Sequence, residues 1–148
     1  MKFLQELQQG RLLKRYKRFL ADVELADGST LTIHCPNTGS MKNCQEPGSR
    51  IWFTDSGNAA RKYPHTWQLI EVNGEHLVGI NTALANKLVE EALHKGLPGE
   101  LAGFSEIKCE VPYGEQRSRI DILLTYPGGQ QCYIEIKNVS LAESGDRG

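Results

Sequence analysis

Two acidic residues and a lysine near the C-terminal end of the sequence are spaced in a way that could bind a metal ion. Asp121 lies in one apolar stretch, and Glu135 and Lys137 lie in the next one. A turn centred on residues 127–129 (Pro-Gly-Gly) predicts that these stretches pair as a hairpin, with Asp121 opposite Glu135 or Lys137. Because strand residues alternate between the two faces of a sheet, all three side chains are then on one face.

This arrangement predicts a divalent cation. Directly opposed side chains lie about 4.5–5.5 Å apart at Cβ, where two carboxylates repel each other unless a cation separates them. Mg²⁺ or Mn²⁺ is suitable, because Mg²⁺ commonly takes one or two carboxylates and completes its shell with water and phosphate oxygens. An ion held by Asp121 and Glu135 would activate a water molecule, and Lys137 would orient that water or neutralise charge on a phosphate. The three residues are therefore predicted to catalyse phosphodiester hydrolysis.

The same residues also have a simpler interpretation. Glu135 and Lys137 could form an ordinary ion pair along one strand, with Asp121 as a second partner of the lysine. Tyr133 and Ile134 favour a central strand, where a surface ion pair is less expected. The metal site is the favoured interpretation, and retained catalysis is a separate hypothesis.

A helix is predicted over residues 83–95, before the hairpin. Thr82 is the expected N-cap and Pro98 follows the end as a stop. The predicted apolar face consists of Leu84, Ala85, Leu88, Val89, Ala92 and Leu93. Glu90 lies opposite this face and Glu91 lies on its border, so Glu91 is the helix acid predicted to reach the metal site.

Three strands are predicted after the helix, over residues 107–111, 118–125 and 131–139. One short helix cannot cover both faces of a sheet with strands this apolar. We therefore expect additional cover, either from a missing C-terminal part of a longer protein or from a second subunit in a homodimer.

The first part of the chain predicts a different architecture, made of short strands separated by turn residues. The expected strands are a kinked one over residues 16–25, and others over residues 31–35, 51–53, 66–72 and 76–80. About five short strands in roughly seventy residues imply a closed or half-closed barrel, because an open sheet this short leaves its edges unpaired. The predicted domains are residues 1–80 and 81–148.

Basic residues are concentrated in the predicted barrel although the net charge of the chain is only -1. Five of the eight residues from 11 to 18 are basic and none is acidic, which favours a partner that carries phosphates, DNA or RNA. The predicted nucleic-acid contacts are Arg15, Lys17 and Arg18, expected on one strand, with Arg61, Lys62 and Arg119. Trp67 could stack on a base, but a place in the core is the favoured interpretation.

The composition predicts a soluble globular protein, with 39% apolar and 24% charged residues in 148. No apolar run approaches the length of a membrane span, and the charged N-terminus is unlike a secretory signal. A cytoplasmic protein without a membrane partner is therefore expected. The four cysteines include no Cys-x-x-Cys pair, which favours packed thiols over disulfides, or over a zinc site begun by His34, Cys35 and Cys44.

Two resemblances extend these expectations. Asp121 followed by Glu135-x-Lys137 resembles the PD-(D/E)xK nuclease fold, with Ile120 in place of the proline. Five segments resemble the sugar fermentation stimulation protein A family: RYKRFLADV (15–23), HCPNTGSM (34–41), RKYPHTW (61–67), SRID (118–121) and YIEIKNVSLAE (133–143). Members of that family are longer than this chain.

The resemblance implies an α/β (α+β) fold, in which an OB-fold-like β-barrel precedes a partial restriction-endonuclease-like domain of one helix and three strands. It also implies DNA binding of low sequence preference and a regulatory link to maltose metabolism. Glu91 matches a helix acid that assists the metal site in some proteins with the nuclease fold.

Three functions remain open on the sequence. The first is a DNA-binding protein with a magnesium-dependent nuclease-type site. The second is an inactive DNA-binding accessory factor whose acids remain from a nuclease ancestor. The third is a barrel that binds a sugar or oligosaccharide, as OB-like barrels also do.

Overall fold

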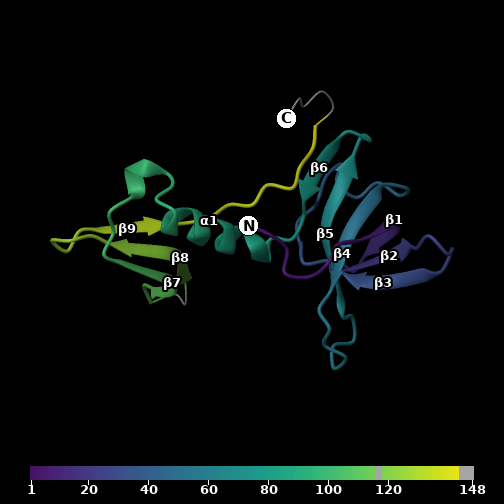
Figure 1. The fold of residues 1–148 in the computed structure, drawn as a ribbon, viewed down its shortest axis with the longest axis horizontal. Helices are drawn as coiled ribbons and strands as arrows, with labels where there is room; N and C mark the ends of the chain where they lie inside the picture. Colours follow the sequence, from purple (N-terminus) through teal and green to yellow (C-terminus); the bar gives the residue numbers. More distant parts are fainter. Residues whose placement is uncertain (116–117, 144–148) are drawn as a thin grey trace. The chain divides into compact units, whose positions relative to one another are not determined.

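The structure of the protein, a computed structural model, describes residues 1–115 and 118–143. The chain forms two compact units (Figure 1). The first contains Lys2–Thr82 together with the segment that begins at Val139, and the second contains Ala83–Asn138.

Six strands form the first unit. They are β1 (Gln8–Tyr16), β2 (Leu20–Glu24), β3 (Thr30–His34), β4 (Arg50–Asp55), β5 (His65–Val72) and β6 (His76–Gly79). Their order in the sheet is β3-β2-β1-β4-β5-β6, and a parallel pairing of His34 with Thr66 joins β3 to β5. This pairing closes β1–β5 into an OB-like barrel, which confirms the predicted architecture and leaves only β6 outside the ring (Figure 1).

The interior of the barrel is filled by the inward-facing residues of its strands. They include Leu12, Val23, Ile33, Ile51, Phe53, Trp67 and Ile70. The Trp67 side chain is fully buried, and its indole N–H donates to the carbonyl oxygen of Leu69 at 2.9 Å. Trp67 therefore belongs to the core, the interpretation that the sequence favoured.

The start of the barrel differs from the prediction of one kinked strand over residues 16–25. β1 ends at Tyr16, and Lys17 and Arg18 lie in a turn with φ angles of 51° and 63°. These two residues are therefore not on one strand with Arg15, as the sequence suggested. Non-glycine residues adopt positive φ infrequently, and neither residue type announces such a turn.

The second unit places one helix against a three-stranded sheet (Figure 1). Its elements are α1 (Ala83–His94), the short 3₁₀ helix η1 (Gly99–Leu101), β7 (Glu106–Tyr113), β8 (Ser118–Thr125) and β9 (Gln131–Ile134). The strands are antiparallel in the order β7-β8-β9, and Leu93 packs with Ile122 and Leu124 in the core. None of the helices in the described ranges is long and apolar enough to span a membrane.

Two predictions for this unit were wrong in detail. Leu88, assigned to the apolar face of the helix, is 47% exposed, because α1 contacts the core through a narrow stripe that includes Val89 and Leu93. β9 ends at Ile134 rather than at residue 139. Two residues beyond that point, the backbone N–H of Ile136 donates to the Asp121 side chain of β8 rather than to a backbone carbonyl.

Residues 139–143, which fall in the second of the two predicted domains, are hydrogen-bonded to the barrel. The side-chain amide of Asn37 donates to Ser140 Oγ at 2.5 Å, and that of Asn43 donates to the Ala142 carbonyl oxygen at 2.6 Å. Ala142 also packs against the barrel core. These contacts bring the segment directly after the predicted site residues onto the first unit.

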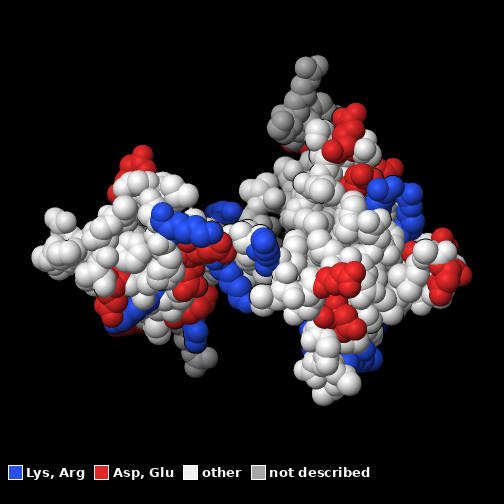
Figure 2. All heavy atoms as spheres, in the orientation of Figure 1, with Lys and Arg blue, Asp and Glu red and all other residues white. Residues whose placement is uncertain are grey.

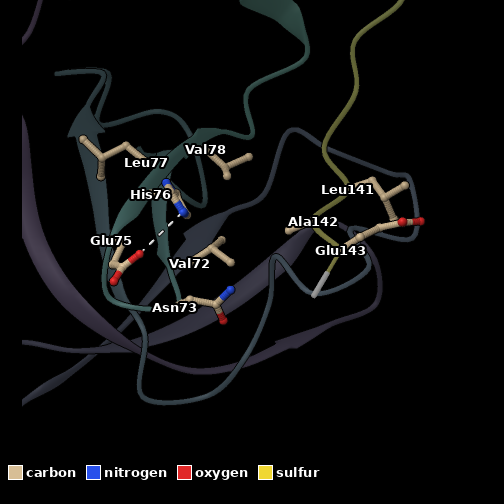
Figure 3. Close-up of a pocket in the computed structure, with 9 residues that line it drawn as sticks. All are labelled: Val72, Asn73, Glu75, His76, Leu77, Val78, Leu141, Ala142 and Glu143. Atoms are coloured by element: carbon tan, nitrogen blue, oxygen red, sulfur yellow. Dashed lines mark ion pairs between the residues drawn. The ribbon is translucent and has the colours of Figure 1, made fainter. Parts of the chain in front are cut away.

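A pocket of about 440 Å³ lies between this segment and the β5–β6 hairpin. Figure 3 shows Leu77 and Val78 on the hairpin and Leu141 on the returning segment. Glu75 and His76 form an ion pair at the rim, with 3.7 Å between Oε2 and Nε2. The pocket is thus largely apolar with a charged edge.

Candidate metal centre and nucleic-acid surface

β8 and β9 bring Asp121 and Glu135 to neighbouring positions. The observed register pairs Ile122 with Ile134. The next step of this register sets Asp121 opposite Glu135, immediately beyond the end of β9. This is one of the two pairings that the sequence predicted.

The half-buried Asp121 carboxylate is held by hydrogen bonds on both oxygens. Oδ2 accepts the backbone N–H of Ile136 at 2.7 Å, and Oδ1 accepts the side-chain amide of Asn86 at 3.2 Å. The same amide donates to Glu110 Oε1, also at 3.2 Å. Because each carboxylate oxygen has two lone pairs, these bonds fix the orientation of Asp121 and still leave room for another ligand.

Lys137 forms an ion pair with Glu135 and is also within electrostatic range of Asp121. The hydrogen bond to Glu135 and the charge of Glu135 raise the pKa of Lys137, and Asp121 raises it further. Lys137 is therefore protonated at neutral pH and acts as a cation and hydrogen-bond donor rather than as a base. The three predicted catalytic residues are thus brought together, with the ammonium group near both acids.

Glu91 is positioned differently from the prediction. Its carboxylate pairs with Lys95 along the helix at 2.6 Å, and this hydrogen bond lowers the pKa of Glu91. Glu90, expected to face away from the sheet, lies close enough to β7 that burial and its charge together raise the pKa of Cys109. Asn86 is the helix residue that contacts Asp121.

The acidic side chains in residues 1–115 and 118–143 include no group of three or more, with His or Cys counted, that could hold a metal ion. Glu91 is therefore not assembled with Asp121 and Glu135 into a three-ligand site. Sequence reasoning also missed Asn86 and Glu110. Asn86 is an amide on a helix from which only acids were expected, and Glu110 lies on β7, outside both the helix and the hairpin of the predicted site. The signal for Asn86 was its spacing, because it lies one helical turn before Glu90 on the same side of the helix.

Arg15, one of the predicted nucleic-acid contacts, is engaged within the barrel. Its Nη2 donates to the carbonyl oxygens of Asn37 at 2.8 Å and Gly39 at 2.9 Å, and to that of Arg18 at 3.1 Å. These bonds order the loop between β3 and β4. The guanidinium group is therefore committed to the loop rather than free for a phosphate.

The other four predicted contacts in the barrel lie close to two tyrosines in the sequence. We name this surface the basic face, and it consists of Tyr16, Lys17, Arg18, Arg61, Lys62 and Tyr63. The four basic residues are exposed and the two tyrosines are half-buried. Tyr16 ends β1, and Lys17 and Arg18 form part of the β1–β2 turn. Residues 61–63 belong to the β4–β5 loop.

Several contacts bring the turn and the loop together. Tyr16 pairs with Leu20 on β2, which pairs with His34 on β3. Tyr63 is close enough to Tyr16 for an electrostatic interaction. Burial lowers the pKa of His34, and the charge of Arg61 lowers it further. Tyr63 and Arg61 of the loop are therefore near Tyr16 at the end of β1 and His34 at the end of β3.

Figure 2 shows acidic and basic side chains interspersed on the visible face of each unit, without one broad basic area among the coloured residues. Arg119, the remaining predicted contact, is exposed on β8 in the second unit.

Comparison with known proteins also divides the chain between the barrel strands and α1, although the second match continues past Asn138. Residues 13–80 match the family model described as the SfsA N-terminal OB domain, and residues 83–147 match the sugar fermentation stimulation protein RE domain. The chain belongs to the sugar fermentation stimulation protein (SfsA) family. Asp121, Glu135 and Lys137 all lie within the segment that matches the RE domain.

Similar SfsA proteins occur in Shewanella. The chain is 54% identical over 143 residues to the sugar fermentation stimulation protein homolog of Shewanella frigidimarina, covering 97% of this chain and 61% of that protein. It is also 54% identical over 145 residues to the homolog of Shewanella baltica, covering 98% and 62%. The chain therefore spans about three fifths of the length of these relatives.

A solved structure of an SfsA protein has a similar fold. It is the structure of Pyrococcus furiosus SfsA in complex with Ca²⁺, which is 28% identical and superposes with a TM-score of 0.74. The similarity covers 91% of this chain and 56% of that one.

Proposed function

We propose that this SfsA protein binds DNA and hydrolyses phosphodiester bonds with the help of a divalent cation, in the manner of PD-(D/E)xK nucleases. The observation that carries the proposal is the convergence of Asp121 and Glu135, from neighbouring strands, around the Lys137 ammonium group. Without a cation, the lysine is the group that compensates the two acids.

The donor set suits a hard cation. Two carboxylates, completed by water and substrate oxygens, are what Mg²⁺ commonly uses, and Ca²⁺ also prefers oxygen ligands. The Pyrococcus furiosus SfsA structure is a complex with Ca²⁺, which supports a hard cation in the family. Asp121 and Glu135 would hold the ion, which would supply charge for a phosphate and lower the pKa of a bound water.

The residues of this chain then have distinct roles. Asp121 is fixed by Ile136 and Asn86 and keeps a lone pair on each oxygen for a cation. Lys137 is the cation of the site, and three quarters of its side chain is exposed. It can leave Glu135 for a phosphate oxygen, where it would neutralise charge that develops during cleavage.

The basic face would hold the substrate. Barrels that bind single strands combine basic residues with aromatic side chains on which bases stack. Lys62 lies 5.5 Å from the centre of the Tyr63 ring, and Lys14 lies 5.0 Å from that of Tyr16. Lys62 and Tyr63 of the basic face are thus already adjacent, and Lys14 of β1 adjoins Tyr16, the other ring of that face.

A cleavage assay on the full-length protein tests the proposal. Linear duplex, single-stranded and branched DNA should each be incubated with Mg²⁺ or Mn²⁺, and with EDTA. We expect cleavage of at least one substrate that requires the cation. Binding of DNA without cleavage under every condition would leave only the second candidate function.

That second candidate is a DNA-binding accessory factor without catalysis. It is supported by the partners that both carboxylates have without a metal. Lys137 neutralises Glu135, and both Asp121 oxygens accept hydrogen bonds. A metal titration of the full-length protein separates the two candidates, because an inactive relic need not bind the cation.

DNA affinity should depend on salt through the basic face. Replacing Arg61 and Lys62 by alanine should weaken binding and make the slope of log K against log salt shallower by about 1.4–1.8, since each lost phosphate contact removes about 0.7–0.9. Fluorescence anisotropy from low to moderate salt measures the slope. The matched control replaces Lys42 and Arg50, which are exposed elsewhere on the barrel. Equal slopes for the two double variants would exclude the basic face from the contact surface.

A further inference from the structure

Asn86 of α1 joins two carboxylates that come from different strands. Its side-chain amide donates to Asp121 Oδ1 on β8 and to Glu110 Oε1 on β7, both at 3.2 Å. Glu110 has a φ of 55°, a conformation that non-glycine residues adopt infrequently. β7 therefore departs from regular strand geometry at the residue whose carboxylate meets the amide.

The amide has a clear electrostatic effect. Carboxylates on adjacent strands repel each other, and an N–H group between them offsets part of this repulsion and orients both. A lysine or arginine at residue 86 would do the same, but its positive charge would also repel a cation. A neutral donor keeps Asp121 in place while the negative charge of the site remains.

We propose that Asn86 is a positioning residue of the metal centre, which orients the Asp121 carboxylate towards a divalent cation. This inference rests on the proposed function and extends it to a residue outside the Asp and Glu-x-Lys pattern. Groups that hydrogen-bond to metal-ligating carboxylates typically contribute 10- to 100-fold to metal affinity. Asn86 and the backbone N–H of Ile136 both hold Asp121.

The test compares cation binding by the full-length wild-type protein, Asn86→Leu and Asn86→Gln. Leucine removes the donor but favours helix more than asparagine does, so the unfolding midpoint in EDTA should remain close to that of the wild type. Isothermal titration with CaCl₂ and MnCl₂ should show that Asn86→Leu binds the cations at least about 10-fold more weakly than the wild type. Asn86→Gln retains the amide and should recover part of this loss.

The control is Leu88→Ala, which alters an exposed position on α1 and should bind the cations as the wild type does. Wild-type affinity in Asn86→Leu would overturn the positioning role while the proposed function stands. Equal losses in Asn86→Leu and Asn86→Gln would also overturn it, because the donor would then be irrelevant. A wild-type protein that binds neither cation would overturn the proposed function itself, and this inference with it.

Discussion

Replacing Asp121 by asparagine should abolish cation binding and lower metal-dependent DNA cleavage by about 10²–10³-fold. A bound metal ion contributes several kcal/mol to stabilising the transition state, and about 1.4 kcal/mol corresponds to a factor of ten in rate. Asparagine has nearly the same shape as aspartate but lacks the charge and has only one acceptor oxygen. It would therefore also lose one of the hydrogen bonds that Asp121 accepts from Asn86 and Ile136.

Lys137→Ala separates binding from chemistry at the same site. Because Lys137 pairs with Glu135 in the absence of a metal, its removal should leave cation affinity unchanged or slightly higher, while cleavage falls. Cation titration and single-turnover cleavage of the full-length protein measure the two effects. Glu106→Gln, an exposed change at the start of β7, is the matched control and should behave as the wild type. Metal-dependent cleavage that persists at the wild-type rate in both Asp121→Asn and Lys137→Ala would show that the active site lies elsewhere.

The hairpin that carries the site could be predicted from sequence because its constraints are local. A Pro-Gly-Gly turn between two apolar stretches limits the register to few alternatives, and period-two alternation then decides which side chains share a face. The observed pairing of Ile122 with Ile134 is one of those alternatives. Helix α1 was similarly accessible, since its predicted end at residue 95 is one residue beyond the observed end at His94.

The helix residue that contacts Asp121 depends on tertiary packing and was not predicted from the sequence. Amphipathicity defines a broad apolar face, but the residues that meet the sheet depend on how the helix is rotated on it. Only Leu93 is fully buried on α1, and this rotation brings Asn86 rather than Glu91 to Asp121. A search confined to acidic residues could not find an amide in that role.

The basic stretch near the N-terminus illustrates a second limit. Arg15 and Arg18 have the same side chain and are three positions apart, so charge patterning treats them alike. In the structure, Arg15 donates to three backbone carbonyl oxygens, whereas Arg18 lies in an exposed turn with positive φ. Those carbonyls belong partly to the loop between β3 and β4, and no local pattern in the sequence indicates that contact.

Substitution of Trp67 should reduce stability, whereas substitution of Tyr63 should reduce DNA affinity, although both belong to the segment that suggested base stacking. Trp67 is fully buried and hydrogen-bonded to Leu69. Trp67→Ala should therefore lower the free energy of unfolding by about 3–5 kcal/mol, a typical cost of truncating a buried aromatic residue. Trp67→Phe should cost less, about 1–3 kcal/mol, through the smaller ring and the lost hydrogen bond. Chemical denaturation followed by circular dichroism measures these changes.

Tyr63→Ala should instead weaken single-stranded DNA binding by about 1–3 kcal/mol, the contribution of one base stacked on an aromatic ring. Its effect on stability should be small, because its interaction with Lys62 at the surface is worth about 0.5–1 kcal/mol. Folded Trp67→Phe should bind DNA with the wild-type affinity, since a ring inside the barrel cannot reach a base. If Trp67→Phe remained stable but lost DNA affinity, and Tyr63→Ala retained it, the stacking surface would have to be reassigned from the loop to β5.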